Sequence, residues 1–187
     1  MKNKLLFVDT ETGGVNPSRH DLLSIGLVVW ESEKILDKEE ILVKGNSRRV
    51  TKEAIAINHI NLKSHNKKGL PREEAVQRLI RFVERNFKEK PVILAGHNVS
   101  FDIAFLKYLF EKTDNDYYKY FSHRHIDTTS ILQYFGIKNN LSNSELLSFS
   151  SSDKAFSNFG IHIKDEERHT ALADAFATAQ LFTQLIH

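Results

Sequence analysis

Apolar residues form short unbroken runs early in the chain and recur at helical spacing later, and this pattern predicts the secondary structure. Strands are expected in three early segments and two later ones, namely residues 5–8, 22–30, 38–45, 91–97 and 125–127. Helices are expected where apolar side chains recur every three or four positions, at residues 51–58, 71–87, 100–109, 128–135 and 170–186. Strands come first and then alternate with helices, which predicts an α/β fold with a mixed sheet in a single domain, residues 1–187.

Polar residues at the boundaries predict how several helices begin. Thr51, Ser100 and Asp127 each precede a predicted helix, and their side-chain oxygens suit the capping of free backbone N–H groups. The Ser-rich stretch 139–156 is expected to be a surface connection that contains a short helix or two.

The composition excludes several classes of protein. Of the 187 residues, 41% are apolar and 27% are charged, which is ordinary for a globular protein. Cysteine is absent, so neither a disulfide scaffold nor a zinc–thiolate site can form, and a reducing cytoplasm is the expected location. No apolar run reaches the roughly 18 residues of a membrane span, so no membrane partner is expected. The net charge of +2 neither supports nor excludes nucleic acid.

Two carboxylates follow the first apolar run directly, in "KLLFVDTETGG". Asp9 and Glu11 are two residues apart, so in an extended strand they point to the same side. Like charges this close repel unless one takes up a proton or a cation lies between them. An oxygen-only ligand set suits Mg²⁺ or Mn²⁺. The alternative is a solvated turn, which is the commoner meaning of an isolated D-x-E pattern.

Two further segments carry acids where a predicted helix begins. In "LAGHNVSFDIAFL", Asp102 lies in the first helical turn after a buried strand, where ligands bind in open α/β sheets. In "RHTALADAFATAQ", His169 and Asp174 are five residues apart and can share a site if His169 precedes the regular helix. Alternatively, Asp102 only complements the helix dipole, and His169 and Asp174 are solvated surface residues.

Taken in order, "FVDTETGG", "GHNVSFDIAFL" and "HTALADA" resemble the three motifs of the DEDD family of 3′–5′ exonucleases, in its histidine-containing branch. The motifs extend from residue 7 to residue 175, so the resemblance covers nearly the whole chain. Within the family, the chain looks most similar to the proofreading epsilon subunit of bacterial DNA polymerase III and to small stand-alone exonucleases.

The resemblance implies a ribonuclease-H-like fold, a five-stranded mixed sheet with an antiparallel second strand and helices on both faces. It also implies hydrolysis of phosphodiester bonds with two divalent cations, Mg²⁺ or Mn²⁺, and release of nucleoside 5′-monophosphates. Carried over by position, His169 would be the general base. The implied metal ligands are Asp9, Glu11, Asp102 and Asp174. The implied substrate contacts are Thr10, Thr12 and Asn98.

The expected substrate is the single-stranded or frayed 3′ end of DNA. An exoribonuclease similar to ribonuclease T or oligoribonuclease is the alternative, because no motif reveals contacts to a 2′-hydroxyl. A non-catalytic nucleic-acid-binding polymerase accessory module is a third reading, although it should have lost one of the acids. The family also makes a polymerase or a second copy of the chain a possible partner. Residues 54–61 fall where relatives meet the terminal base, but "AIAINHIN" departs from their usual His-Gly-Ile-Thr pattern.

Other chemistry-bearing residues have simpler interpretations. His123 and His125 are two apart and a metal pair is conceivable, but without cysteine or a suitably spaced acid, exposed or hydrogen-bonded histidines are the better interpretation. Lys67, Lys68 and Arg72 form a small basic group that is expected to face solvent.

Overall fold

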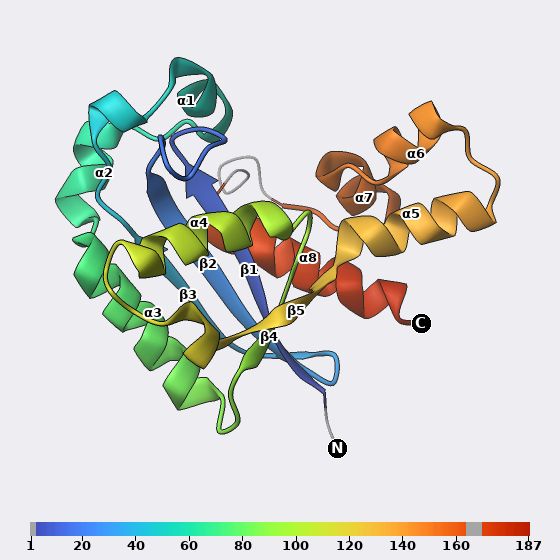
Figure 1. Cartoon of the computed structure of the whole chain (residues 1–187). Coiled ribbons are helices and arrows are strands. Elements are labelled where there is room, and N and C mark those ends of the chain that lie inside the picture. The colour runs from blue at the N-terminus through green and yellow to red at the C-terminus, as the bar shows by residue number, and fades with distance from the viewer. Residues whose placement is uncertain (1–2, 164–169) are drawn as a thin grey trace.

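A five-stranded mixed sheet lies at the centre of the computed structural model, which describes residues 3–163 and 170–187 (Figure 1). Its strands are β1 (Lys4–Thr12), β2 (Leu22–Glu31), β3 (Lys34–Leu42), β4 (Val92–Gly96) and β5 (Phe121–Asp127). Their order across the sheet is β3-β2-β1-β4-β5. Strand β2 is antiparallel to β1 and β3, whereas β4 is parallel to both β1 and β5. The predicted mixed sheet with an antiparallel second strand is confirmed.

Helices cover both faces of the sheet, as expected (Figure 1). The α-helices are α1 (Lys52–Asn58), α2 (Leu62–Lys68), α3 (Arg72–Asn86), α4 (Ser100–Glu111), α5 (Thr128–Lys138), α6 (Asn143–Phe149), α7 (Ser152–Asn158) and α8 (Ala171–Leu185). Two 3-10 helices, Ser47–Arg49 and Tyr117–Lys119, lie in the connections. None of the helices in the described ranges is long and apolar enough to cross a membrane.

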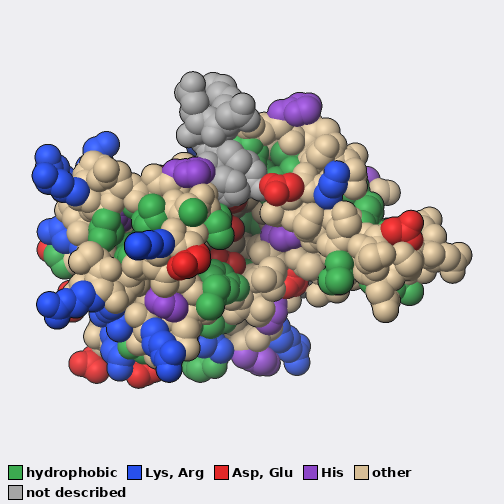
Figure 2. All heavy atoms as spheres, turned by 90° about the horizontal axis from the view of Figure 1, so that it is seen from above, with side chains coloured by type: hydrophobic (Ala, Val, Ile, Leu, Met, Phe, Trp, Pro, Cys, Tyr) green, Lys and Arg blue, Asp and Glu red, His purple; other side chains and the backbone are tan. Residues whose placement is uncertain are grey.

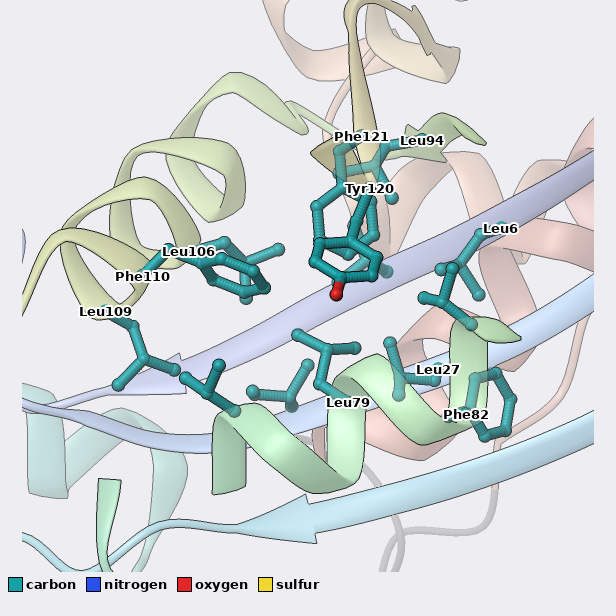
Figure 3. Packing of buried hydrophobic residues seen from close by; sticks show 14 of the residues in the cluster. Leu6, Leu27, Leu79, Phe82, Leu94, Leu106, Leu109, Phe110, Tyr120 and Phe121 are labelled. Atoms are coloured by element: carbon teal, nitrogen blue, oxygen red, sulfur yellow. The ribbon is translucent and has the colours of Figure 1, made fainter. Parts of the chain in front are cut away.

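Strand β1 is buried on both faces because its side chains alternate between two hydrophobic clusters. Leu6 and Val8 pack with α3 and α4, in the cluster that Figure 3 shows around Leu79 and Phe110. Leu5 and Phe7 point the other way and pack with Ala175, Ala179 and Phe182 of α8. The alternation continues to the end of the strand, so residues 9 and 11 face α8 and residue 10 faces α4.

Helix α8 begins directly over a glycine of β2. Gly26 pairs with Asp9 on one side and with Glu40 on the other, and an added Cβ at Gly26 would lie 2.0 Å from the Ala171 carbonyl oxygen. Glu40 accepts a hydrogen bond from the backbone N–H of Leu172 at the same helix end. Close backbone approach at Gly26 therefore places the first turn of α8 next to the end of β1.

Several boundaries differ from the sequence prediction. Strand β3 starts at Lys34, not 38, because Ser32 and Glu33 both adopt positive φ and close a tight two-residue hairpin. Strand β5 starts at Phe121, four residues before the predicted start. Helix α2 was not predicted because it is polar and exposed, so it leaves no hydrophobic period in the sequence.

Of the three predicted caps, two are confirmed. Thr51 accepts from the backbone N–H of Ala54, and Asp127 from that of Thr129. The prediction for Ser100 is wrong: Val99 is the N-cap of α4, and no side chain caps this helix. Residue 99 already has helical dihedral angles, so Ser100 lies inside the first turn.

The Ser-rich connection is more ordered than its composition suggests. It forms α6 and α7, and the latter buries Ala155 and Phe156 against Leu132 of α5 and Leu181 of α8. The prediction of a short helix or two is confirmed, but the connection is only partly a surface feature. These helices extend the molecule on the outer side of α8 (Figure 1).

Replacing Gly26 by alanine should displace the start of α8. The new methyl group would collide with backbone at Ala171, and overpacking of this kind costs about 1–3 kcal/mol in the free energy of unfolding. Denaturant unfolding measures the loss. Gly160→Ala is the control, because a Cβ there meets nothing within 4 Å and only the strain of its positive φ remains. An unfolding free energy of Gly26→Ala equal to that of the wild type would contradict this packing.

Candidate active site

Three carboxylates from two distant segments converge where β1 ends. Asp9 and Glu11 come from the strand face that is turned toward α8, and Asp174 comes from the first turn of that helix. One oxygen from each residue lies within 4.8 Å of the others, and all three residues are partly buried. The sequence prediction that these acids share one site agrees with this arrangement.

This cluster has the chemistry of a divalent-cation site. Two unit negative charges 4.8 Å apart repel by about 3 kcal/mol at an effective dielectric constant near 20. A cation between them converts that repulsion into attraction. All three ligand atoms are carboxylate oxygens, which Mg²⁺ and Mn²⁺ prefer, so the residues present fit such an ion.

Asp102 does not join that set of three in the described part of the chain, because it lies on the α4 side of β1. Its Oδ1 accepts a 2.6 Å hydrogen bond from the Thr10 hydroxyl, and its carboxylate also accepts from the backbone N–H groups of Thr10 and of Asp102 itself. Burial raises the pKa of Asp102 to about 7, and these hydrogen bonds only partly oppose the shift. Thr10 thus connects Asp102 to the strand end that carries Asp9 and Glu11.

The other predicted site residues have different outcomes. His169 lies outside the described residues. Thr12 is buried and its hydroxyl donates to the Gly14 carbonyl, which shapes the turn after β1. Asn98 is exposed, with φ at 53°, and its backbone N–H donates to the Asp127 carboxylate at 2.9 Å and to the Thr129 hydroxyl at 3.0 Å. The Asn98 residue is therefore held beside the start of α5.

A groove of about 430 Å³ lies where β1 ends, and Glu11 is the member of the acidic cluster that lines it. Thr10, Glu11 and Thr12 form its base, so Glu11 belongs to both the groove and the acidic cluster. One wall is the loop after β1, and the opposite wall is α1 with Thr51 before it. Figure 2 views the molecule from this end and shows acidic and hydrophobic side chains around a hollow.

The groove contains apolar side chains that sequence reasoning did not assign to a site. Val15 and Ile57 are 81% and 63% exposed, and Phe101 at the start of α4 also lines the groove. Ile57 falls within residues 54–61, where the resemblance places terminal-base contacts. Val15 has a weaker sequence signal, since it is a lone aliphatic residue in a polar loop, and Phe101 lies within the helix predicted for residues 100–109.

Curated proteins similar to this chain include ribonuclease T from several bacteria and a PolC-type DNA polymerase III. Ribonuclease T of Buchnera aphidicola is 24% identical over 191 residues, covering 96% of this chain and 82% of that protein. Ribonuclease T of Shewanella denitrificans is 24% identical over 189 residues, covering 96% of this chain and 79% of that protein. The PolC-type DNA polymerase III of Thermotoga maritima is 27% identical over 181 residues, which cover 96% of this chain but 12% of the polymerase.

Solved structures share the fold. E. coli exonuclease I in complex with a dT13 oligonucleotide superposes with a TM-score of 0.79 at 17% identity, covering 98% of this chain. Only 41% of the exonuclease I chain is matched, so this chain spans about two fifths of that protein. The fold is thus the ribonuclease-H-like exonuclease fold.

The family match covers the sheet and all three acid-bearing segments. The exonuclease family model (RNase_T) matches residues 6–182, which include both acids of β1, Asp102 and Asp174. Together with the shared fold, this match shows that the chain belongs to the exonuclease family.

Proposed function

We propose that this protein is a divalent-metal-dependent 3′–5′ exonuclease that releases nucleoside 5′-monophosphates from single-stranded or frayed 3′ ends of DNA. The observation that carries the proposal is the convergence of Asp9, Glu11 and Asp174 within 4.8 Å beside a groove. Such a cluster is costly to leave without a cation, and the family is one of exonucleases.

Each acid has a distinct role in this proposal. Asp9, Glu11 and Asp174 would hold one divalent ion, and Asp102 would serve a second. The chemistry that such ions would supply is a lower pKa for a bound water molecule and compensation of negative charge at the scissile phosphate. His169, the residue that defines the histidine-containing branch, accepts the proton of the attacking water.

The groove is proposed to hold the terminal nucleotide. Val15, Ile57 and Phe101 form an apolar surface on which a base can pack. Every nucleobase has a π-face, so this contact does not depend on the identity of the base. Thr10 and Thr12 lie at the base of the groove near the proposed sugar position, and Asn98 lies beside the scissile region. In this arrangement the last base of the strand occupies the groove, and the phosphate next to it lies at the acids.

RNA is the second candidate substrate. The exonuclease I neighbour was solved with an oligodeoxynucleotide, which favours DNA, whereas curated relatives named ribonuclease T favour RNA. A non-catalytic polymerase accessory module is disfavoured because the sequence keeps all four acids and His169. A polymerase and a second copy of this chain are both proposed partners. The similarity to a PolC-type DNA polymerase III supports the polymerase.

Removing one ligand should abolish hydrolysis without unfolding the protein. We expect Asp9→Ala to eliminate release of mononucleotides from a 3′-labelled oligonucleotide, and His169→Ala to slow it about 10²–10⁴-fold. Excess EDTA should stop the wild type. Asp37→Asn is the control, since Asp37 lies on β3 and pairs with Arg85 of α3. Full activity of Asp9→Ala, or turnover in EDTA, would refute the proposal.

Digestion of matched DNA and RNA strands should separate the two substrates. We expect faster removal of 3′ nucleotides from DNA, measured on strands of the same base sequence in Mg²⁺ and in Mn²⁺. Mononucleotides should be the first products, because the enzyme is expected to remove terminal nucleotides before any internal fragment forms. Preferential digestion of RNA would replace the DNA assignment with the exoribonuclease alternative, and binding without cleavage would favour the accessory module.

Asp102 predicts how stability depends on pH when no metal is bound. Its pKa is about 7 in the folded protein against a reference value of 3.8, so the folded state retains a proton that the unfolded chain releases between these values. Its stabilising contribution is therefore complete below about pH 4 and lost as the pH rises through 7, by at most about 4 kcal/mol.

Denaturant unfolding in EDTA at a series of pH values measures that dependence. Asp102→Asn should remove the Asp102 contribution and flatten the loss of stability between pH 4 and 7. Divalent cations should oppose the loss in the wild type, because they favour the ionised carboxylate. Parallel pH profiles for the two proteins would contradict a raised pKa.

A further inference from the structure

The outer wall of the groove is a loop that the hydrophobic core does not hold. Residues 14–20 connect β1 to β2, and none of them is buried. The loop is organised internally around Asn16, whose carbonyl accepts from the backbone N–H groups of Arg19 and His20. The His20 ring in turn accepts from the Asn16 N–H at 3.0 Å. Val15 and His20 are the residues that this unit contributes to the groove, together with Gly14.

An ionic cluster around one buried aspartate attaches this loop to the rest of the protein. Asp21 is 2% exposed, and its Oδ1 accepts from Arg49 Nε and from Arg72 Nη2, each at 2.6 Å. Its other oxygen accepts from the backbone N–H of Asn46 at 2.7 Å. We call Asp21, Arg49 and Arg72 the Asp21 cluster. The hydrogen bond to Asp21 raises the pKa of the Arg49 guanidinium.

Arg49 extends from this cluster into the loop itself. Its Nη2 lies 3.1 Å from the Ser18 carbonyl oxygen and 3.4 Å from those of Pro17 and His20. Within residues 3–163 and 170–187, the only other hydrogen bond from a distant side chain to residues 14–20 is a 3.5 Å contact from the Tyr108 hydroxyl to the Ser18 carbonyl. In the described structure, the position of the loop thus depends mainly on one guanidinium group.

The same cluster also connects the two walls of the groove. Gly13 donates to the Asp21 carbonyl at 2.7 Å, Asp21 donates to the Arg49 carbonyl at 3.1 Å, and the Thr51 N–H donates to Gly13 at 2.8 Å. Thr51 caps α1, the helix that carries Ile57 on the opposite wall. Figure 1 shows the loop after β1 lying beside α1. Backbone hydrogen bonds at residues 13, 21, 49 and 51 therefore join the two walls, and Asp21 and Arg49 take part in them as well as in the side-chain cluster.

We infer that Asp21, acting through Arg49, is a positioning residue that sets the width of the groove and hence the affinity for the terminal nucleotide. This inference rests on the proposed function and adds a determinant of substrate binding to it. None of the cluster lies among the three converging carboxylates, so its loss should weaken substrate binding in the ground state and the transition state alike. That is the signature of a change in KM with little change in kcat.

Steady-state digestion of a short single-stranded oligonucleotide tests the inference. Asp21→Asn removes the charge at nearly constant volume, and we expect KM to rise about tenfold while kcat changes less than about threefold. The affinity for Mn²⁺, measured by calorimetry without nucleic acid, should equal that of the wild type. Asp37→Asn is the matched control, because it breaks a pairing with Arg85 and Asn86 on α3, outside the groove, and should leave KM unchanged.

A second variant keeps the test decisive if Asp21→Asn fails to fold. Arg49→Lys can retain the ion pair with Asp21, but one ammonium group cannot also reach the loop carbonyls, so we expect a smaller rise in KM. An unchanged KM in Arg49→Lys or in folded Asp21→Asn would overturn the inference. So would an equal rise in Asp37→Asn, or a parallel loss of Mn²⁺ affinity.

Binding measurements separate this inference from the proposed function. Fluorescence anisotropy of a labelled oligonucleotide in EDTA compares Kd values without hydrolysis. A wild type that binds but does not cut would refute the nuclease proposal, and a weaker Kd for Asp21→Asn would still support the positioning role. A wild type that cuts, with equal Kd and KM in Asp21→Asn, would leave the proposed function intact and overturn the inference alone.

Discussion

The close approach of α8 to β2 at Gly26 is the constraint on which the acidic site depends. A glycine there lets helix backbone touch strand backbone, and Gly26 is the direct cross-strand neighbour of Asp9. Asp174, in the first turn of the helix, therefore meets the acids of β1. Any larger residue would lift the helix and separate carboxylates that come from opposite ends of the chain.

This arrangement works against the electrostatics of the folded protein. Three carboxylates gather on one side of β1, and a fourth is buried on the other, where desolvation favours its neutral form. The hydrophobic clusters on both faces of β1 offset this electrostatic cost. They bury residues 5–8, so the packing of the strand does not depend on its last residues. Strand alternation divides the acids, since residues 9 and 11 face α8 while Thr10 presents its hydroxyl to Asp102.

The groove beside the acids is held by different physics. Its base is sheet, but its walls are a polar loop and a short helix with little buried surface. Ion pairs and backbone hydrogen bonds hold these walls in place, whereas apolar packing holds the strand that carries the acids. Asp21 can have this role because three donors surround it, including two arginines from separate segments. Residues 9–21 therefore contain both a strand end that apolar packing holds and a groove wall that polar contacts hold.

The sequence by itself determined the strand alternation of Asp9 and Glu11, the helical position of Asp102 and Asp174, and the order of motifs that indicates the family. These are local properties, because periodicity and capping act over a few residues. Only the tertiary structure decided that Asp102 lies across β1 from the other three acids, that Val15 and Ile57 share a groove, and that Asp21 joins two arginines. Such contacts join residues up to 92 positions apart, and a sequence pattern does not encode which distant side chains a folded chain brings together.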